Sequence, residues 1–154
     1  MRPHVDPYSD LVMDHFLHPR HAGALAGATG IAEVKNNTCG DVTCIYVRIE
    51  GDGLRASGFL ASGCGPGIAC ASYLLARVTG RTVSDALAVK PENIMRALSL
   101  PSAKRHAAEM AVESLSRAVE DHRARGSPPL EGSAVQPGTS PKPLYPGNPI
   151  VKGI

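Results

Sequence analysis

Residues 42–62 read VTCIYVRIEGDGLRASGFLAS, a pattern that predicts a β-hairpin. In the first half every second side chain is apolar, so that one face of the strand carries Ile45, Val47 and Ile49. The Gly-Asp-Gly sequence at 51–53 supplies a turn, and residues 54–62 return as the second strand. The preceding segment GIAEVKN, at 30–36, is the candidate for a third strand.

Helical patterns flank the hairpin on both sides. Before it, residues 8–16 predict a short amphipathic helix with Ser9 as its N-cap, because apolar side chains recur there at helical spacing. After it, residues 66–80 predict a helix, and three more helices are predicted at 84–88, 91–98 and 102–125. Ser102 is the predicted cap of the last one. Strands first and helices afterwards favour an α+β fold, in which a small antiparallel sheet of about three strands is covered on one face by helices.

The composition changes after Arg125, and the change divides the chain into two parts. Residues 126–154 contain seven of the 13 prolines and show no apolar periodicity. Such a segment cannot bury enough apolar surface to offset the entropy that it would lose on ordering. We therefore predict one folded domain over residues 1–125 and a disordered, Pro/Gly-rich C-terminal tail over residues 126–154.

Charge and composition exclude several classes of protein. The 16 basic and 14 acidic side chains leave a net charge of +2 with no basic run, so a nucleic-acid partner is not expected. No apolar stretch approaches the roughly 20 residues that span a bilayer, and the start lacks the pattern of a signal peptide, so we expect no membrane association and a cytoplasmic location. Thiols stay reduced there. The four cysteines are therefore expected to be ligands, nucleophiles or buried apolar residues rather than disulfides.

Two cysteines occupy loops that the predicted hairpin brings to one end of the sheet. Cys39 lies in NNTCGD just before the first hairpin strand, and Cys64 lies between glycines just before a helix. The helix dipole at Cys64 favours the thiolate, which is the form of cysteine that binds metal or attacks sulfur. Asp41 lies two residues after Cys39. Together with the two cysteines it makes a partial site for a thiophilic ion. The pattern leaves open that they are unrelated small residues in two loops.

Four blocks of sequence stand out: YSDLVMDHFLHPRHAGAL (8–25), NNTCGDVTCIYVRI (36–49), SGCGPGIACAS (62–72) and LPSAKRHAAEMAVESLSRAV (100–119). In this order and at these separations they resemble the IscU/NifU-type family of iron–sulfur cluster assembly scaffolds. The similarity runs from residue 8 to about residue 122 and so covers nearly the whole predicted domain. The resemblance implies that a [2Fe-2S] cluster, iron or zinc is bound by Cys39, Asp41, Cys64 and His106.

The family's third cysteine is absent. In the family it follows the histidine directly, within an LPxxKxHC motif, and here that position is Ala107. The four implied ligands can still complete a site, since imidazole replaces thiolate on one iron in Rieske-type centres. The missing cysteine is also the family's favoured acceptor of persulfide sulfur, so another thiol has to take that role.

Two further cysteines are candidates for it. Cys70 is expected in the first turns of the helix over 66–80, where its sulfur approaches Cys64 as a ligand or sulfur acceptor. Its apolar neighbours fit a buried core role instead. Cys44 lies about 16 Å from Cys39 along an extended strand, and we interpret it as a small strand residue.

The resemblance implies a scaffold that is not an enzyme: it holds a transient [2Fe-2S] cluster and passes it to acceptor proteins. The implied partners are a cysteine desulfurase, a frataxin-like or ferredoxin-type helper, the iron–sulfur acceptor proteins, and a chaperone that binds Leu100 to Lys104. Two alternatives stay open. One is a zinc-bound sulfur-transfer protein, and the other is a decayed scaffold that acts as an interaction or regulatory protein, as Ala107 suggests. No HExxH, GxSxG or P-loop spacing is present, so a hydrolase is not expected.

Overall fold

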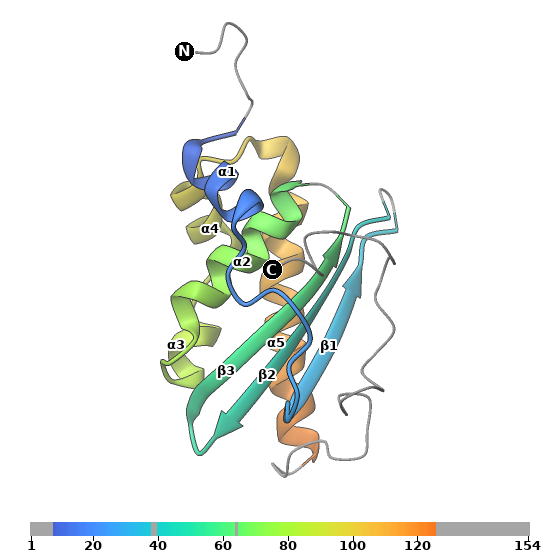
Figure 1. The fold of residues 1–154 in the computed structure, drawn as a ribbon, viewed down its shortest axis with the longest axis vertical. Coiled ribbons are helices and arrows are strands. Elements are labelled where there is room, and N and C mark those ends of the chain that lie inside the picture. Colours follow the sequence, from blue (N-terminus) through green and yellow to red (C-terminus); the bar gives the residue numbers. More distant parts are fainter. Residues whose placement is uncertain (1–7, 38–39, 64, 126–154) are drawn as a thin grey trace, which may run out of the picture.

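The computed structural model describes residues 8–37, 40–63 and 65–125 (Figure 1). The predicted tail, residues 126–154, lies outside the described residues, as do Cys39 and Cys64. The described part consists of helices packed on an antiparallel sheet, which confirms the predicted α+β fold. No helix within these residues is long and apolar enough to cross a membrane.

The sheet has three strands in the order β1 (Gly30–Lys35), β2 (Val42–Glu50) and β3 (Gly53–Ser62), and both pairs are antiparallel. The predicted hairpin and third strand are therefore confirmed. The hairpin turn needs glycine because Gly51 has a φ of +62°, a left-handed conformation that other residues rarely adopt. At the far end of the hairpin, Val42 pairs with Ser62. This register places the residues just outside both strands next to each other.

All the predicted helices are present, and they are α1 (Asp10–Leu17), α2 (Gly65–Val78), α3 (Val83–Leu87), α4 (Pro91–Leu98) and α5 (Arg105–Arg125). Ser9 caps α1 as predicted, since its Oγ accepts a hydrogen bond from the Val12 amide at 3.2 Å. The predicted cap at Ser102 is wrong. A short 3-10 turn, η1 (Ser102–Lys104), precedes α5, and a hydrogen bond from the Lys104 amide to the Pro101 carbonyl closes it. Ser102 therefore lies inside this turn rather than in front of a helix.

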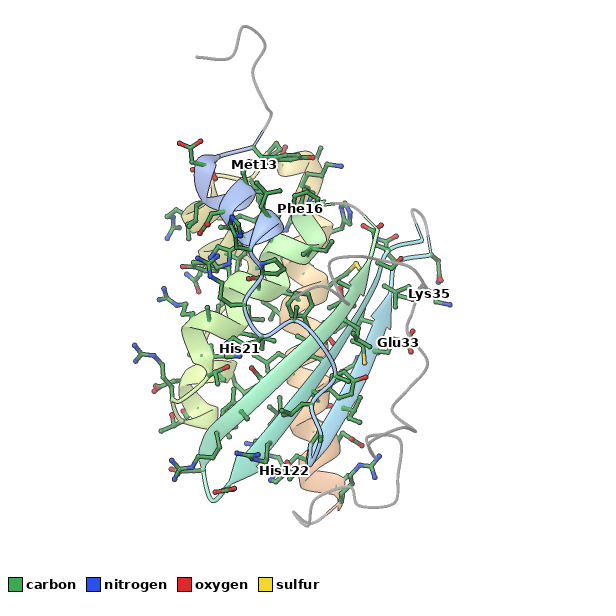
Figure 2. The ribbon with its side chains drawn as sticks, viewed as in Figure 1. Met13, Phe16, His21, Glu33, Lys35 and His122 are labelled. Atoms are coloured by element: carbon green, nitrogen blue, oxygen red, sulfur yellow. The ribbon has the colours of Figure 1, made fainter. Side chains whose placement is uncertain are left out.

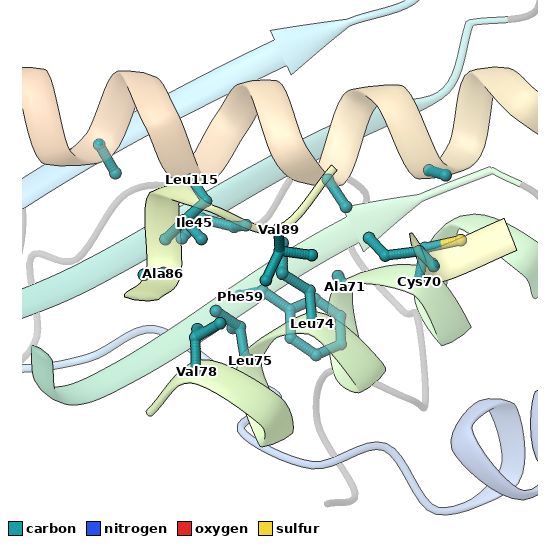
Figure 3. Packing of buried hydrophobic residues seen from close by; sticks show 14 of the residues in the cluster. Ile45, Phe59, Cys70, Ala71, Leu74, Leu75, Val78, Ala86, Val89 and Leu115 are labelled. Carbon is teal, nitrogen blue, oxygen red and sulfur yellow. The ribbon is translucent and has the colours of Figure 1, made fainter. Parts of the chain in front are cut away.

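The core lies between the sheet and the helical layer formed mainly by α2 and α5 (Figure 3). The sheet face that packs there carries Ile45, Val47 and Ile49, which are the residues that the alternating pattern placed on one face. Phe59 of β3 faces Leu74 of α2 in the same cluster (Figure 3). The helices therefore cover one face of the sheet, as predicted.

The opposite face of the sheet carries a smaller apolar cluster, whose buried members are Ala28, Cys44, Tyr46 and Leu60. The segment between α1 and β1 contributes to it through Ala28 and the half-buried Leu25. Burial raises the pKa of the Cys44 thiol to about 12. Cys44 is thus a protonated, inaccessible strand residue, as its position in the alternating pattern indicated.

Side-chain and backbone contacts hold α5 close along β1. Gly30 has no room for a side chain, because a Cβ there would overlap the Ala118 carbonyl oxygen and lie 2.9 Å from the His122 amide nitrogen. The Asp121 carboxylate accepts a hydrogen bond from the Ile31 amide at 2.9 Å. His122 Nδ1 also lies 2.7 Å from Thr29 Oγ1, and both residues are buried. These contacts hold the C-terminal half of α5 along β1.

Candidate metal site

Three parts of the chain meet at one end of the sheet. Asp41 directly precedes β2 and Gly63 directly follows β3, and the pairing of Val42 with Ser62 makes them neighbours. The first turn of α5 reaches the same end of the sheet through His106. The sequence-based hypothesis required the strands over 42–50 and 54–62 to be hairpin partners, and they are.

Asp41 and His106 are in direct contact. Asp41 Oδ2 lies 3.3 Å from His106 Nε2, so an oxygen and a nitrogen donor are presented together. The Asp41 side chain is 10% exposed and that of His106 is 27% exposed, so the pair is accessible mainly from the histidine side. The structure therefore brings together two of the four ligands that the resemblance implied.

The loop before Asp41 is closed by its own backbone. The Asn36 amide donates to the Asp41 carbonyl at 2.8 Å, and the Gly40 amide donates to the Asn36 carbonyl at 2.7 Å. Gly40 has a φ of +78°, which explains the glycine in the CGD motif. These bonds hold the backbone of Asp41 in place independently of its side chain.

Gly63 packs against the Asp41 carboxyl group. A Cβ at Gly63 would overlap Oδ1 and Cγ of Asp41 and lie 3.0 Å from its Cβ. The backbone also has a φ of +119° there. The first glycine of the GCG motif therefore leaves the space that the Asp41 carboxyl group occupies.

Gly65, on the other side of Cys64, packs against α1. A Cβ at Gly65 would lie 3.3 Å from Cδ1 and 3.4 Å from Cε1 of Phe16. Figure 2 shows Phe16 on α1, close to the start of α2. Sequence reasoning missed this contact, and the only signal for it was a glycine on each side of Cys64.

Arg105 links the start of α5 to α4 through an ion pair with Glu92. Its guanidinium donates to the carboxylate of Glu92 on α4 and, at 2.8 Å, to that of Glu109 one turn along α5. It also lies 3.6 Å from the sulfur of Met95. Because Arg105 directly precedes His106, these contacts position the backbone of the histidine. Nothing in the sequence singled this arginine out.

The structure describes Cys70 but not Cys39 or Cys64. Cys39 and Cys64 fall outside the described residues, although their chain neighbours Gly40, Gly63 and Gly65 lie at this end of the sheet. Cys70 is 0% exposed and belongs to the main core cluster (Figure 3). This burial favours the core role that the sequence left open for Cys70.

Ala107, where the third cysteine was expected, is 2% exposed and is also part of the core cluster. Among the described residues, no group of three or more His, Cys, Asp or Glu side chains is arranged to bind a metal ion. Asp41 and His106 can therefore supply two donors to an ion whose remaining ligands come from elsewhere.

Comparison with known proteins identifies the family. The sequence model of the NifU-like N terminal domain matches residues 7–128. The chain belongs to the NifU-like N-terminal domain family. The match contains all four blocks of sequence and the end of the sheet where Asp41 meets His106.

Two curated relatives of this NifU-like chain are named for iron–sulfur cluster assembly. It is 36% identical over 124 residues to the iron–sulfur cluster assembly protein IscU of Plasmodium falciparum, a match that covers 79% of this chain and 76% of the relative. It is 34% identical over 116 residues to an iron–sulfur cluster assembly scaffold protein IscU of Archaeoglobus fulgidus, covering 75% of this chain and 76% of the relative.

Solved structures share the fold of the NifU-like domain. The N-terminal part of a NifU-like protein from Brucella abortus matches with a TM-score of 0.62 and 17% identity, covering 75% of this chain and 94% of that one. A candidate iron–sulfur cluster assembly scaffold protein for the SUF system, from Fervidobacterium islandicum, matches with a TM-score of 0.62 and 21% identity. That match covers 73% of this chain and 96% of the other.

Proposed function

We propose that this protein is a scaffold for iron–sulfur cluster assembly, which holds a transient [2Fe-2S] cluster and passes it to acceptor proteins without enzymatic activity of its own. Membership of the NifU-like family and 34–36% identity to proteins named for this process support the proposal. The observation that carries it is the contact between Asp41 and His106 at the end of the sheet to which the CGD and GCG loops lead.

The proposed ligands are Cys39, Asp41, Cys64 and His106. Thiolates suit iron–sulfur clusters, and imidazole nitrogen can replace a thiolate on one of two irons. Asp41 supplies a carboxylate, which is a harder donor than sulfur and binds iron of a cluster less strongly. A site of such mixed donors suits a protein that has to release its cargo. Cys70 is fully buried and is not needed for this ligand set.

The site also suggests how sulfur and cluster enter and leave. Since Ala107 offers no thiol, we propose that Cys39 or Cys64 accepts sulfur from a cysteine desulfurase. A helper of the frataxin or ferredoxin type and the acceptor proteins are the other proposed partners, in the cytoplasm. A chaperone is proposed to bind Leu100 to Lys104, the link between α4 and α5, in which Pro101 and Ser102 are exposed.

Anaerobic reconstitution with iron and sulfide tests the proposal. The protein should then show the visible absorption of a [2Fe-2S] centre, and Cys39→Ser or Cys64→Ser should abolish it, because a hydroxyl is a poor ligand for a soft site. Cys44→Ala is the matched control. The Cys44 thiol is buried among apolar side chains on the opposite face of the sheet, so its loss should not affect the absorption.

Three other results would point elsewhere. A full cluster in both serine variants would refute the ligand assignment. Zinc in place of iron in the purified protein, with sulfur accepted on a zinc-site thiol, would favour the sulfur-transfer protein. A wild-type protein that binds neither ion would favour the decayed scaffold, for which the buried Ala107 is the specific observation.

A further inference from the structure

The Asp41 carboxyl group lies directly against the Cα of Gly63. The Asp41 carboxyl group fills the position that a side chain at 63 would need, and its Oδ2 lies 3.3 Å from His106 Nε2. The backbone of Asp41 is held separately by its hydrogen bond from the Asn36 amide. A methyl group at position 63 would overlap Oδ1 and Cγ of Asp41, and the carboxyl group, as the end of a flexible side chain, is the part that can turn away while this backbone hydrogen bond is kept.

We propose that Gly63 is a positioning residue for the metal site: it acts through Asp41, by letting the carboxyl group lie against the loop and face His106. The inference rests on the proposed function, in which both side chains are ligands. In a chain with Ala107 in place of the third thiolate, these two donors make up half of the proposed ligand set. Their orientation before a metal arrives therefore contributes directly to how long the metal is held.

The alternative explanation of this glycine is its backbone. Gly63 has a φ of +119°, and any other residue would be strained there whatever the space around it. The chain offers a matched control, because Gly23 has a φ of +113° and a Cβ added there would meet no atom within 4 Å. Gly23→Ala therefore places a side chain at nearly the same positive φ without a clash.

The first measurement uses the metal-free full-length protein. Gly63→Ala should shift the His106 ring signals in two-dimensional NMR spectra in the direction that Asp41→Ala shifts them, whereas Gly23→Ala should leave them unchanged. In urea unfolding, Gly63→Ala should also destabilise the Asp41→Ala variant less than the wild type, because the overlapping atoms have gone. The remaining 3.0 Å contact with the Asp41 Cβ can be relieved by a small shift. Gly23→Ala should lower the free energy of unfolding by the same amount in the wild type and in the Asp41→Ala variant.

The second measurement uses the zinc-loaded protein and a chelator. Zinc loss from Gly63→Ala should be about tenfold or more faster than from the wild type, as for other residues that orient metal ligands, with Gly23→Ala unchanged. Three results for Gly63→Ala would each overturn the proposal. They are unshifted His106 signals, a loss of unfolding free energy that simply adds to that of Asp41→Ala, and an unchanged rate of zinc loss. If Gly63→Ala alone does not fold, folding of the double variant supports the proposal and its failure overturns it. A wild type that binds no metal would refute the proposed function, and the metal-free measurement would still decide whether Gly63 positions Asp41.

Discussion

Asp41 and His106 are 65 residues apart in the sequence, yet Oδ2 of one lies 3.3 Å from Nε2 of the other. The contact joins the loop before β2 to the first turn of α5. It depends on the hairpin register, which places Asp41 at the end of the sheet, and on the packing of α5 along β1. The site is therefore built by the packing of the whole domain rather than by one loop.

Removing the imidazole should weaken metal binding. We expect His106→Ala to lose zinc to a chelator at least tenfold faster than the wild type, because one of four proposed donors is gone. His18→Ala is the control, since His18 is exposed at the end of α1. Equal rates for the wild type and the His106 variant would show that the histidine is not a ligand.

Restoring the family's third thiol should have the opposite effect. Ala107→Cys should slow the loss of a reconstituted cluster to a chelator, because a third thiolate raises the affinity for a thiophilic ion. The variant should also accept sulfur at position 107, measured by mass spectrometry. If Ala107→Cys changed neither property while Cys70→Ser abolished both, the buried Cys70 would be the acceptor instead.

A methyl group at Gly65 should loosen α1. Its Cβ would lie 3.3 Å from the Phe16 ring, so that the ring has to move by a few tenths of an ångström. We expect this crowding to outweigh the gain in helix propensity from alanine and to lower the free energy of unfolding by about 1 kcal/mol. We expect urea unfolding to show this loss for Gly65→Ala and a smaller loss when Phe16→Leu is already present. Gly53→Ala should cost less, because the atoms nearest to its Cβ would be those of the flexible Arg55 side chain and, at 3.6 Å, the Glu50 carbonyl oxygen. A cost for Gly65→Ala that is independent of residue 16 would contradict the packing described.

Stability should fall in mild acid. Burial lowers the pKa of His15 and of His122, which lie 2.7 Å from the hydroxyl oxygens of Ser72 and Thr29. Below the unfolded histidine pKa of about 6.5, the unfolded chain binds more protons than the folded one, so the free energy of unfolding decreases as the pH falls. Urea unfolding at neutral and mildly acidic pH measures this slope.

The contribution of His122 can be measured with a variant that keeps a polar side chain but does not titrate. His122→Asn should reduce the pH dependence, because burial lowers the pKa of this histidine in the folded protein. A slope unchanged by His122→Asn would assign the effect to other groups.

The sheet was predictable because alternation over residues 42–50 has one simple cause, a strand with one face in the core. The start of α5 was not, since Ser102 looks like a cap in the sequence and only the hydrogen bond between Lys104 and Pro101 makes it part of a turn. Periodicity gives no information about which distant residues meet. Asp41 and His106 were paired by resemblance alone, and the crowding at Gly63 depends on a side chain 22 positions away.

Anomalous diffraction from crystals of the zinc-loaded protein is the decisive experiment for the proposed ligand set, because it locates the ion and its ligands together. We predict one zinc ion at the end of the sheet, about 2.0–2.3 Å from the Sγ atoms of Cys39 and Cys64, a carboxylate oxygen of Asp41 and Nε2 of His106. An ion bound elsewhere, or one at this end of the sheet that is not coordinated by Asp41 and His106, would refute the proposed site.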